Sequence, residues 1–353
     1  MAPVRPLLKP ALRRVWRDDS TLQLGVDPRH AVVISGLDAP ATRLVDSLDG
    51  TRDRGGVLAT GFGLGLDAWR VHELLSLLDR SGVLDDGAAD RRHLAGLSHH
   101  ERERLAPDLA AQSVVRRGTD GGAAVLARRG TSVVGVRGAG RVGASIATLL
   151  AAAGVGALLV DDPATTTARD TAPAGAAAAD VGLPRQDAAL RSAKRVAPAV
   201  RSSIPRRRHE ADLIVLAPVG LVEPHLPDRL LRRGVVHLFA GVRDGTGIVG
   251  PLVLPGRSSC HRCHDLHRAD RDPAWPSVAA QLTGTSRQLD APCDVVLATA
   301  VAAQAATQVL ALLDGDPAPP AVDGTIEMSQ TDGRVRRRGW SVHPHCGCAW
   351  SPH

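Results

Sequence analysis

Four of the five cysteines form two close pairs. Cys260 and Cys263 are spaced C-x-x-C in CHRC, and Cys346 and Cys348 are spaced C-x-C in CGC, far along the chain. Two chelating thiolate pairs brought together make a four-sulfur tetrahedral site, which is typical of structural zinc. Because all four ligand positions are then filled, we expect the metal to tie the C-terminus to its domain. Reduced thiols or disulfides are the alternative.

The fifth cysteine, Cys293, precedes Asp294 and an expected helix over 295–313. A helix N-terminus lowers the pKa of a thiol, so Cys293 is a candidate nucleophile. A buried, inert cysteine is the interpretation we favour. For the five histidines that flank the paired cysteines we expect supporting or solvent roles, although one could replace a sulfur ligand. They are His261, His264, His267, His343 and His345.

A glycine-rich loop lies between an expected strand at 133–136 and a small-residue helix at 144–153. Its glycines, Gly138, Gly140 and Gly143, are spaced G-x-G-x-x-G. The next expected strand, 157–160, runs into Asp161. This order predicts a Rossmann fold, with a tight turn, phosphate at the helix N-terminus and an acid on the ribose.

GVGALLVDD and the later DVGLPR, residues 180–185, resemble the ThiF/MoeB-type superfamily of adenylyltransferases, relatives of ubiquitin-activating enzymes. The resemblance implies a Rossmann-like domain over 131–353, ATP and Mg²⁺, adenylation of a C-terminal carboxylate, a structural zinc at the paired cysteines and usually a homodimer. The nucleotide contacts that it implies are Gly138, Gly140, Arg141, Gly143, Asp161 and Arg185.

Several residues depart from that family's pattern. Arg141 replaces a glycine of the loop, Arg185 replaces a lysine, and residues 163–167 supply neither the usual arginine nor the usual glutamine. The strand expected at 212–217 runs into Pro218 and Val219, where the family has a magnesium-binding acid. Because phosphoryl transfer depends on positioning and charge neutralisation, we expect no catalytic residues and a degenerate site. An active adenylyltransferase, with Cys293 as acceptor, and another nucleotide-binding role are the alternatives.

The N-terminal segment, residues 1–88, predicts three short strands at 12–16, 21–26 and 31–35 and then helices at 38–50 and 67–82. This order predicts a winged-helix-like α+β domain. It resembles the PqqD-like domains that bind leader peptides, which implies a peptide strand beside the small sheet and against the second helix. The candidate contacts are Val32, Val33, Ile34, Val71, Leu75 and Leu78. A winged helix that only packs or dimerises is the alternative, and DNA binding is less favoured.

Residues 89–130 are expected to be a linker, with a helix opened by a capping box at Ser98–Glu101 and a hairpin over 113–127. A second hairpin is expected over 325–330 and 334–340, whose arginines we expect to face solvent.

The formal net charge is +6, and nearly all the basic residues are arginines spread along the chain. With no tyrosine and two phenylalanines, few rings are available to stack on bases, so a nucleic-acid partner is unlikely in comparison with an acidic peptide. Polar residues interrupt the apolar run over 295–313, which predicts a buried or interface helix. The N-terminus lacks the features of a signal peptide, and we expect a cytosolic protein without a membrane partner.

Together the two parts resemble the leader-peptide-binding partner proteins of thiazole/oxazole-modified microcin biosynthesis. That resemblance implies a scaffold that captures a precursor leader peptide and presents it to a separate, ATP-using cyclodehydratase. Structural zinc is then expected, and ATP with Mg²⁺ and a homodimer are what the resemblance to the adenylyltransferases alone implies.

Overall fold

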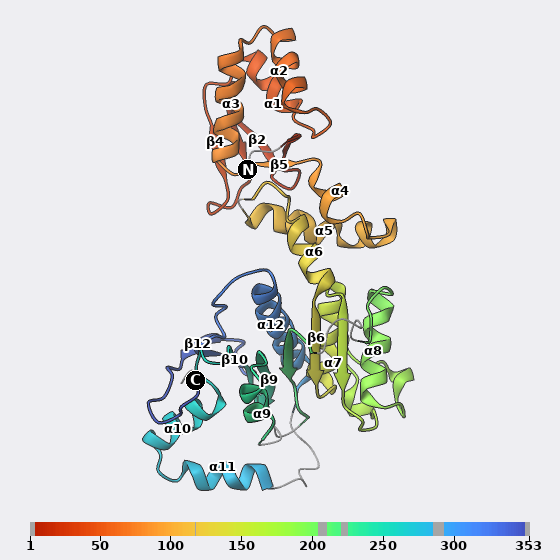
Figure 1. The fold of residues 1–353 in the computed structure, drawn as a ribbon, viewed down its shortest axis with the longest axis vertical. Coiled ribbons are helices and arrows are strands. Elements are labelled where there is room, and N and C mark those ends of the chain that lie inside the picture. The colour runs from red at the N-terminus through yellow and green to blue at the C-terminus, as the bar shows by residue number, and fades with distance from the viewer. Residues whose placement is uncertain (1–3, 117, 204–209, 220–224, 285–292, 350–353) are drawn as a thin grey trace. The chain divides into compact units, whose positions relative to one another are not determined.

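The computed structural model describes residues 4–116, 118–203, 210–219, 225–284 and 293–349 (Figure 1). These residues form two compact units, Met1–Arg128 and Arg129–His353, each with its own hydrophobic core. The finer division of the first unit into a recognition domain and a linker stays a prediction.

Unit 1 contains a three-stranded antiparallel sheet in the order β2-β3-β4 and a two-stranded sheet formed by β1 and β5. The strands are β1 (Pro6–Leu8), β2 (Arg14–Asp18), β3 (Thr21–Leu24), β4 (Val32–Ile34) and β5 (Leu84–Asp86). The helices that follow β4 are α1 (Ala39–Asp46), α2 (Arg54–Gly63) and α3 (Ala68–Arg80). The buried apolar side chains of these strands and helices form one core. The three predicted strands and the predicted helix α3 all contribute to it.

Each of the three helices begins at an aspartate whose side chain accepts a backbone N–H of the first turn. The caps are Asp38, Asp53 and Asp67. The sequence analysis missed α2 because its glycines, including Gly55 and Gly56, have poor helix propensity. The Asp53 cap and the packing of Val57 in the core stabilise it instead.

The rest of unit 1 is helical: α4 (Ala89–His93), α5 (His99–Val115) and the start of α6 (Ala123–Thr131). Ser98 caps α5 as predicted, but the hairpin predicted over 113–127 is wrong. The turn signals were real, since Gly121 and Gly122 have positive φ, but they join two helices. Asp120 begins α6 by accepting the N–H of Ala124, and the apolar spacing of α6 is helical.

One buried lysine joins α5 to the strands of unit 1. Lys9, 1% exposed, donates to the carbonyls of Ser113 and Arg116, and its ammonium lies 3.7 Å from the Asp85 carboxylate. Ser113 also donates to Asp85. Because a buried charge is costly unless it is paired and hydrogen-bonded, these contacts fix α5 against β5.

Unit 2 is built on a seven-stranded mixed sheet in the order β12-β11-β10-β9-β8-β6-β7. Its strands are β6 (Val133–Arg137), β7 (Ala157–Asp161), β8 (Leu213–Leu216), β9 (His237–Arg243), β10 (Thr246–Val253), β11 (Gly324–Ser329) and β12 (Val335–Gly339). The β7-β6-β8-β9 half is parallel, and the rest is antiparallel. The first strand, β6, lies between β7 and β8, so the chain changes direction across the sheet here, where Rossmann-type folds bind ligands.

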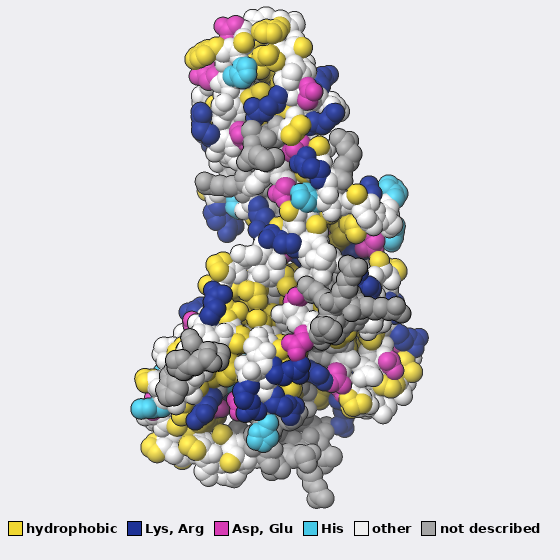
Figure 2. All heavy atoms as spheres, viewed as in Figure 1, with side chains coloured by type: hydrophobic (Ala, Val, Ile, Leu, Met, Phe, Trp, Pro, Cys, Tyr) yellow, Lys and Arg dark blue, Asp and Glu magenta, His cyan; other side chains and the backbone are white. Residues whose placement is uncertain are grey.

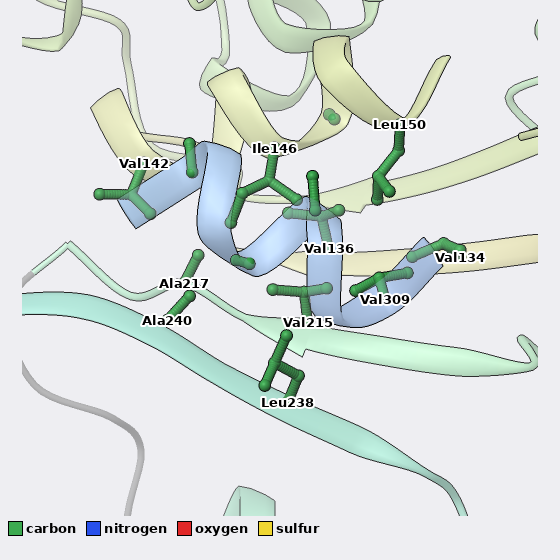
Figure 3. Packing of buried hydrophobic residues seen from close by; sticks show 14 of the residues in the cluster. Val134, Val136, Val142, Ile146, Leu150, Val215, Ala217, Leu238, Ala240 and Val309 are labelled. Carbon is green, nitrogen blue, oxygen red and sulfur yellow. The ribbon is translucent and has the colours of Figure 1, made fainter. Parts of the chain in front are cut away.

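Two helices, α7 (Arg141–Ala152) and α12 (Val295–Leu313), cover one face of this sheet. Figure 3 shows Val142, Ile146 and Leu150 of α7 and Val309 of α12 packed with side chains of β6, β8 and β9. Helix α12 is long and apolar enough by composition to cross a membrane. Its Val301, like Val309, is fully buried in this core, whereas Val296 is 73% exposed, so the helix is partly buried, in agreement with the prediction of a buried or interface helix.

The remaining helices of unit 2 are α8 (Arg185–Val196), α9 (Leu226–Arg232), α10 (His261–Arg271) and α11 (Trp275–Gly284), with short 3-10 turns at Ala168–Asp170 and Ala178–Asp180. The predicted β11–β12 hairpin is present, and its Arg336 and Arg338 pair with Glu327. On the face shown in Figure 2, Lys and Arg side chains are scattered over both units among acidic groups. The charge excess therefore does not gather on that face as one basic surface.

Candidate functional site

The glycine loop joins β6 to α7, as predicted, and its glycines allow close backbone contacts. Gly138 has φ of +90°, and a Cβ there would lie 2.2 Å from the carbonyl oxygen of Ala217, just after β8. A Cβ on Gly140 would lie 2.4 Å from Cγ2 of Val219. At Gly138 only glycine fits, because φ is positive and the backbone after β8 approaches it, whereas at Gly140 a Cβ would require the Val219 side chain to move. No side chain caps the first turn of α7.

A pocket of about 280 Å³ opens at the ends of β6, β7 and β8. Its lining residues are Arg137, Gly138, Asp161, Asp162, Pro163, Arg185, Leu216, Pro218, Val219 and Leu226. Of the residues predicted to bind a nucleotide, Gly138, Asp161 and Arg185 line this pocket. Gly140, Arg141 and Gly143 belong to the loop and to the first turn of α7 beside it.

Asp161 ends β7 at the position expected for the ribose acid, and both it and Arg137 are about half exposed. The Arg137 guanidinium forms an ion pair with this carboxylate. The acid that would accept the ribose hydroxyls therefore already has a cationic partner within the chain.

Arg185 begins α8 and is mostly buried, with its side chain 16% exposed. Its Nη2 lies 3.0 Å from Oδ1 of Asp170, and its Nη1 lies 3.8 Å from Oδ2 of Asp162. Asp162 Oδ2 also accepts the N–H of Ala139, inside the glycine loop. The Arg185 guanidinium and the Ala139 amide are thus both bonded to carboxylates of the protein.

Asp162 and Asp170 were missed by the sequence analysis. Asp162 directly follows the expected ribose acid, and Asp170 lies in a segment whose alanines and threonines predicted no element. The only local signal was the order Thr167-Ala168-Arg169-Asp170, which is an N-cap followed three residues later by an acid. In the structure Thr167 N and Oγ both donate to Asp170.

Arg141, for which the resemblance implied a nucleotide contact, bonds to the segment before α12. Its Nη1 donates to the carbonyl oxygen of Cys293 at 2.7 Å, and its Nε is buried without a partner among the described residues. Burial raises the pKa of the Cys293 thiol, an effect that Arg141 partly opposes. Asp294 caps α12 by accepting two N–H groups. This environment favours the inert interpretation of Cys293 over the reactive one.

The residues after β8 carry no acid as far as Val219, and Pro218 and Val219 line the pocket with apolar atoms. Within the described ranges, no three metal-binding side chains come together at this pocket. The carboxylates that line the pocket, among the described residues, are Asp161 and Asp162, and each already lies beside an arginine.

The four paired cysteines do come together. Cys260 Sγ lies 3.8 Å from Cys263 Sγ and 3.5 Å from Cys346 Sγ, and Cys263 Sγ lies 3.3 Å from Cys348 Sγ. All four sulfurs lie within 4.8 Å of one another. A tetrahedron with metal–sulfur bonds of about 2.3 Å has sulfurs about 3.8 Å apart, so the cluster fits a metal such as zinc.

The positions of these cysteines explain how they meet. Cys260 is the N-cap of α10 and Cys263 lies in its first turn, whereas Cys346 and Cys348 flank Gly347, whose φ of +74° makes a turn. Hydrogen bonds, first from the Cys260 thiol and also from the His343 N–H, lower the pKa of Cys263, whereas the pKa values of Cys260 and Cys348 are raised, first by the hydrogen bond to Cys263 and by burial respectively. A thiolate is the form that binds metal, so Cys263 is the first ligand that this environment provides.

The histidines near this centre support the C-terminal segment. His343 Nδ1 accepts the N–H of His345, so in the neutral ring the Nε2–H donates to Asp270 at 2.9 Å. His267, Asp270 and His343 lie close enough to hold a metal, but this tautomer leaves Nε2 of His343 without a lone pair for one. His264 stacks on the buried Trp340, with ring centroids 4.6 Å apart.

The six residues predicted to contact a peptide belong to β4 and α3 in unit 1. Val33 is 43% exposed and Val32 is half-buried. The others are core residues with exposures of 5% or less, namely Ile34, Val71, Leu75 and Leu78. The side chains of these four pack in the core of unit 1. A peptide contact for any of the six stays a prediction.

Comparison with solved structures shows the same fold along nearly the whole chain. Escherichia coli MccB, solved with AMPCPP and MccA, matches with a TM-score of 0.70 at 13% identity, covering 98% of this chain and 99% of MccB. MccB solved with ATP matches with a TM-score of 0.68 at 13% identity, covering 97% and 99%. PaaA matches with a TM-score of 0.68 at 18% identity, covering 94% and 99%.

Comparison by sequence gives the family. None of the curated proteins matches this chain significantly. The profile of the ThiF family matches residues 119–349, which include the glycine loop, the pocket and all four clustered cysteines. Because this match spans well over half of the sequence, the protein belongs to the ThiF family.

Proposed function

We propose that this protein is a leader-peptide-binding partner in the biosynthesis of a ribosomally made, modified peptide, and that it presents the precursor to a cyclodehydratase-type enzyme. One observation carries the non-catalytic part of the proposal: the two arginines that line the nucleotide pocket, Arg137 and Arg185, are paired with the chain's own carboxylates. Adenylation requires free cations and a bound metal to neutralise the triphosphate. In this pocket both arginines are already paired, and no group of three metal-binding side chains lies there among the described residues.

The peptide-binding part rests on unit 1, which we take to be a winged-helix-like, PqqD-like domain. β4 is an edge strand of the β2-β3-β4 sheet, and among the described residues no strand pairs with its other side. Arg70 of α3 donates to the carbonyl of Gly36 just beyond β4, so the helix runs beside that edge. An extended peptide can add to such an edge through backbone hydrogen bonds. MccB, whose fold spans both units, has been solved with N-formylated MccA.

We propose zinc for the four-cysteine cluster, with Cys260, Cys263, Cys346 and Cys348 as ligands. Bound there, zinc would supply a cross-link between α10 and the C-terminal segment and no reactive position, because the four sulfurs complete the tetrahedron. The role is structural.

Anisotropy of a fluorescein-labelled synthetic leader, taken from the precursor encoded nearest to this protein's gene, tests the proposal with the full chain. Val33→Lys places a charge on the β4 edge and should weaken leader binding about tenfold or more. Val15→Lys is the matched control, because Val15 is 42% exposed and lies on β2, the opposite edge of the same sheet. No leader affinity in the unmodified protein, or equal losses in both variants, would contradict the proposal.

The second candidate is an ATP-dependent adenylyltransferase acting on a peptide or carrier-protein C-terminus. The observation in its favour is that the glycine loop, Asp161 and Arg185 keep their places around a pocket in a ThiF-family fold. Exchange of pyrophosphate into ATP that depends on a peptide and disappears in Asp161→Ala would establish this function instead.

A further inference from the structure

A buried carboxylate, Asp170, lies behind the pocket wall, bonded to the pocket residue Arg185. Asp170 Oδ1 lies 3.0 Å from Arg185 Nη2, and it is 3.6 Å from the point where a Cβ on Gly140 would stand. The acid therefore lies between the cation and the glycine loop, the two groups that would otherwise hold phosphate oxygens.

This carboxylate is fixed in place. Its Oδ2 accepts hydrogen bonds from Thr167 N at 2.8 Å and Thr167 Oγ at 2.9 Å, and its side chain is 6% exposed. Moving it aside would leave the two Thr167 donors unsatisfied and would remove the closer of the two carboxylates at Arg185, each at a cost. Asp162 holds the second side of the same cation and the Ala139 amide.

We propose that Asp170 determines which ligand the pocket accepts: it takes the place of phosphate at Arg185 and so excludes nucleoside di- and triphosphates. What remains is suited to an uncharged nucleoside, since Asp161 offers acceptors for hydroxyls and Pro163, Leu216 and Pro218 line the wall. The inference rests on the proposed function, because a pocket that adenylates would have to admit ATP.

The test compares adenosine, AMP, ADP and ATP as probes by isothermal titration of the full chain without added divalent cation. For the unmodified protein, affinity should stay constant or fall as phosphates are added. Asp170→Asn keeps an oxygen for Thr167 but presents an uncharged amide to Arg185, which leaves Asp162 at 3.8 Å as the carboxylate paired with the guanidinium among the described residues. ATP should bind this variant about tenfold or more tightly than the unmodified protein, with adenosine unchanged.

Two further variants distinguish an effect of Asp170 at Arg185 from the effect of the change in net charge on ATP affinity. Asp187→Asn, on the exposed side of the first turn of α8, removes the same charge outside the pocket and should leave ATP affinity unchanged. Adding Arg185→Gln to Asp170→Asn should abolish the gain, because the cation is then gone. A gain of similar size in Asp187→Asn would overturn the proposal.

The proposal is also overturned if Asp170→Asn binds ATP no more tightly than the unmodified protein, or if the unmodified protein prefers ATP to adenosine tenfold. Should Asp170→Asn fail to fold, as judged by thermal melting, the nucleotide series on the unmodified protein decides. Leader binding, measured on the same preparations, reports separately on the proposed function, so failure of one inference is distinguishable from failure of the other.

Discussion

Replacement of Gly140 by alanine tests the contact that brings the residues after β8 onto the glycine loop. The added Cβ would lie 2.4 Å from Cγ2 of Val219, about 1 Å inside ordinary van der Waals contact. Val219 is β-branched, so its χ1 rotates only at a cost, although it is 48% exposed and has room to move. We therefore expect Gly140→Ala to destabilise unit 2 by about 1–2 kcal/mol.

A second substitution should remove that cost. Val219→Ala deletes the atom that the new Cβ meets, and alone it should cost less than about 1 kcal/mol because Val219 is half exposed. In Gly140→Ala/Val219→Ala most of the loss should be recovered, with a coupling free energy of about 1 kcal/mol. Gly143→Ala is the control without rescue, because its Cβ would lie 1.9 Å from the backbone carbonyl of Gly138.

The assay is pulse-labelling hydrogen exchange of the α7 amides across a urea series, which reports on the unit that contains the loop. The reasoning is refuted if Gly140→Ala leaves the urea midpoint of unfolding unchanged. It is also refuted if Val219→Ala lowers the stability of the unmodified protein and of the Gly140→Ala variant by the same amount. The first result would mean that Val219 does not restrict the space at Gly140. The second would mean that the two residues are not in contact.

Three other outcomes follow from the structure. Metal analysis should find one ion per chain, and Cys346→Ser or a strong chelator should lower the melting temperature, which added zinc restores only in the unmodified protein. Asp314→Asn should cost about 3–5 kcal/mol in urea unfolding, because Arg129, 4% exposed, loses its buried partner; a loss below about 1 kcal/mol would contradict this. Burial lowers the pKa of His237 from 6.5, so stability should be complete above about pH 6.5 and fall as the pH drops below it, since the unfolded chain then takes up a proton more readily. Burial lowers the pKa of His261 and His264 in the same direction, so His237→Phe should reduce that pH dependence only in part, and an unchanged slope would show that His237 does not contribute to it.

Much of unit 2 could be predicted from local order. The strand, glycine loop, helix and second strand at 133–161 lie where the sequence predicted them, because apolar runs and glycine turns act over a few residues. The cysteine pairs were equally local, since C-x-x-C and C-x-C can each chelate. The hairpin over 113–127 was wrong for a related reason, because a glycine turn does not state whether it joins strands or helices.

The glycine spacing, the paired thiols and the lack of an acid at Pro218 and Val219 can be read directly along the chain. Which charges meet depends on how the chain folds. Asp170 lies far along the chain from the glycine loop and fifteen residues before Arg185, yet the fold places its carboxylate against both. Pairing of charges depends on distance in space, which spacing along the chain does not specify once the segment between them is irregular. For the same reason Arg141, adjacent to the loop in sequence, is drawn instead to the carbonyl of Cys293.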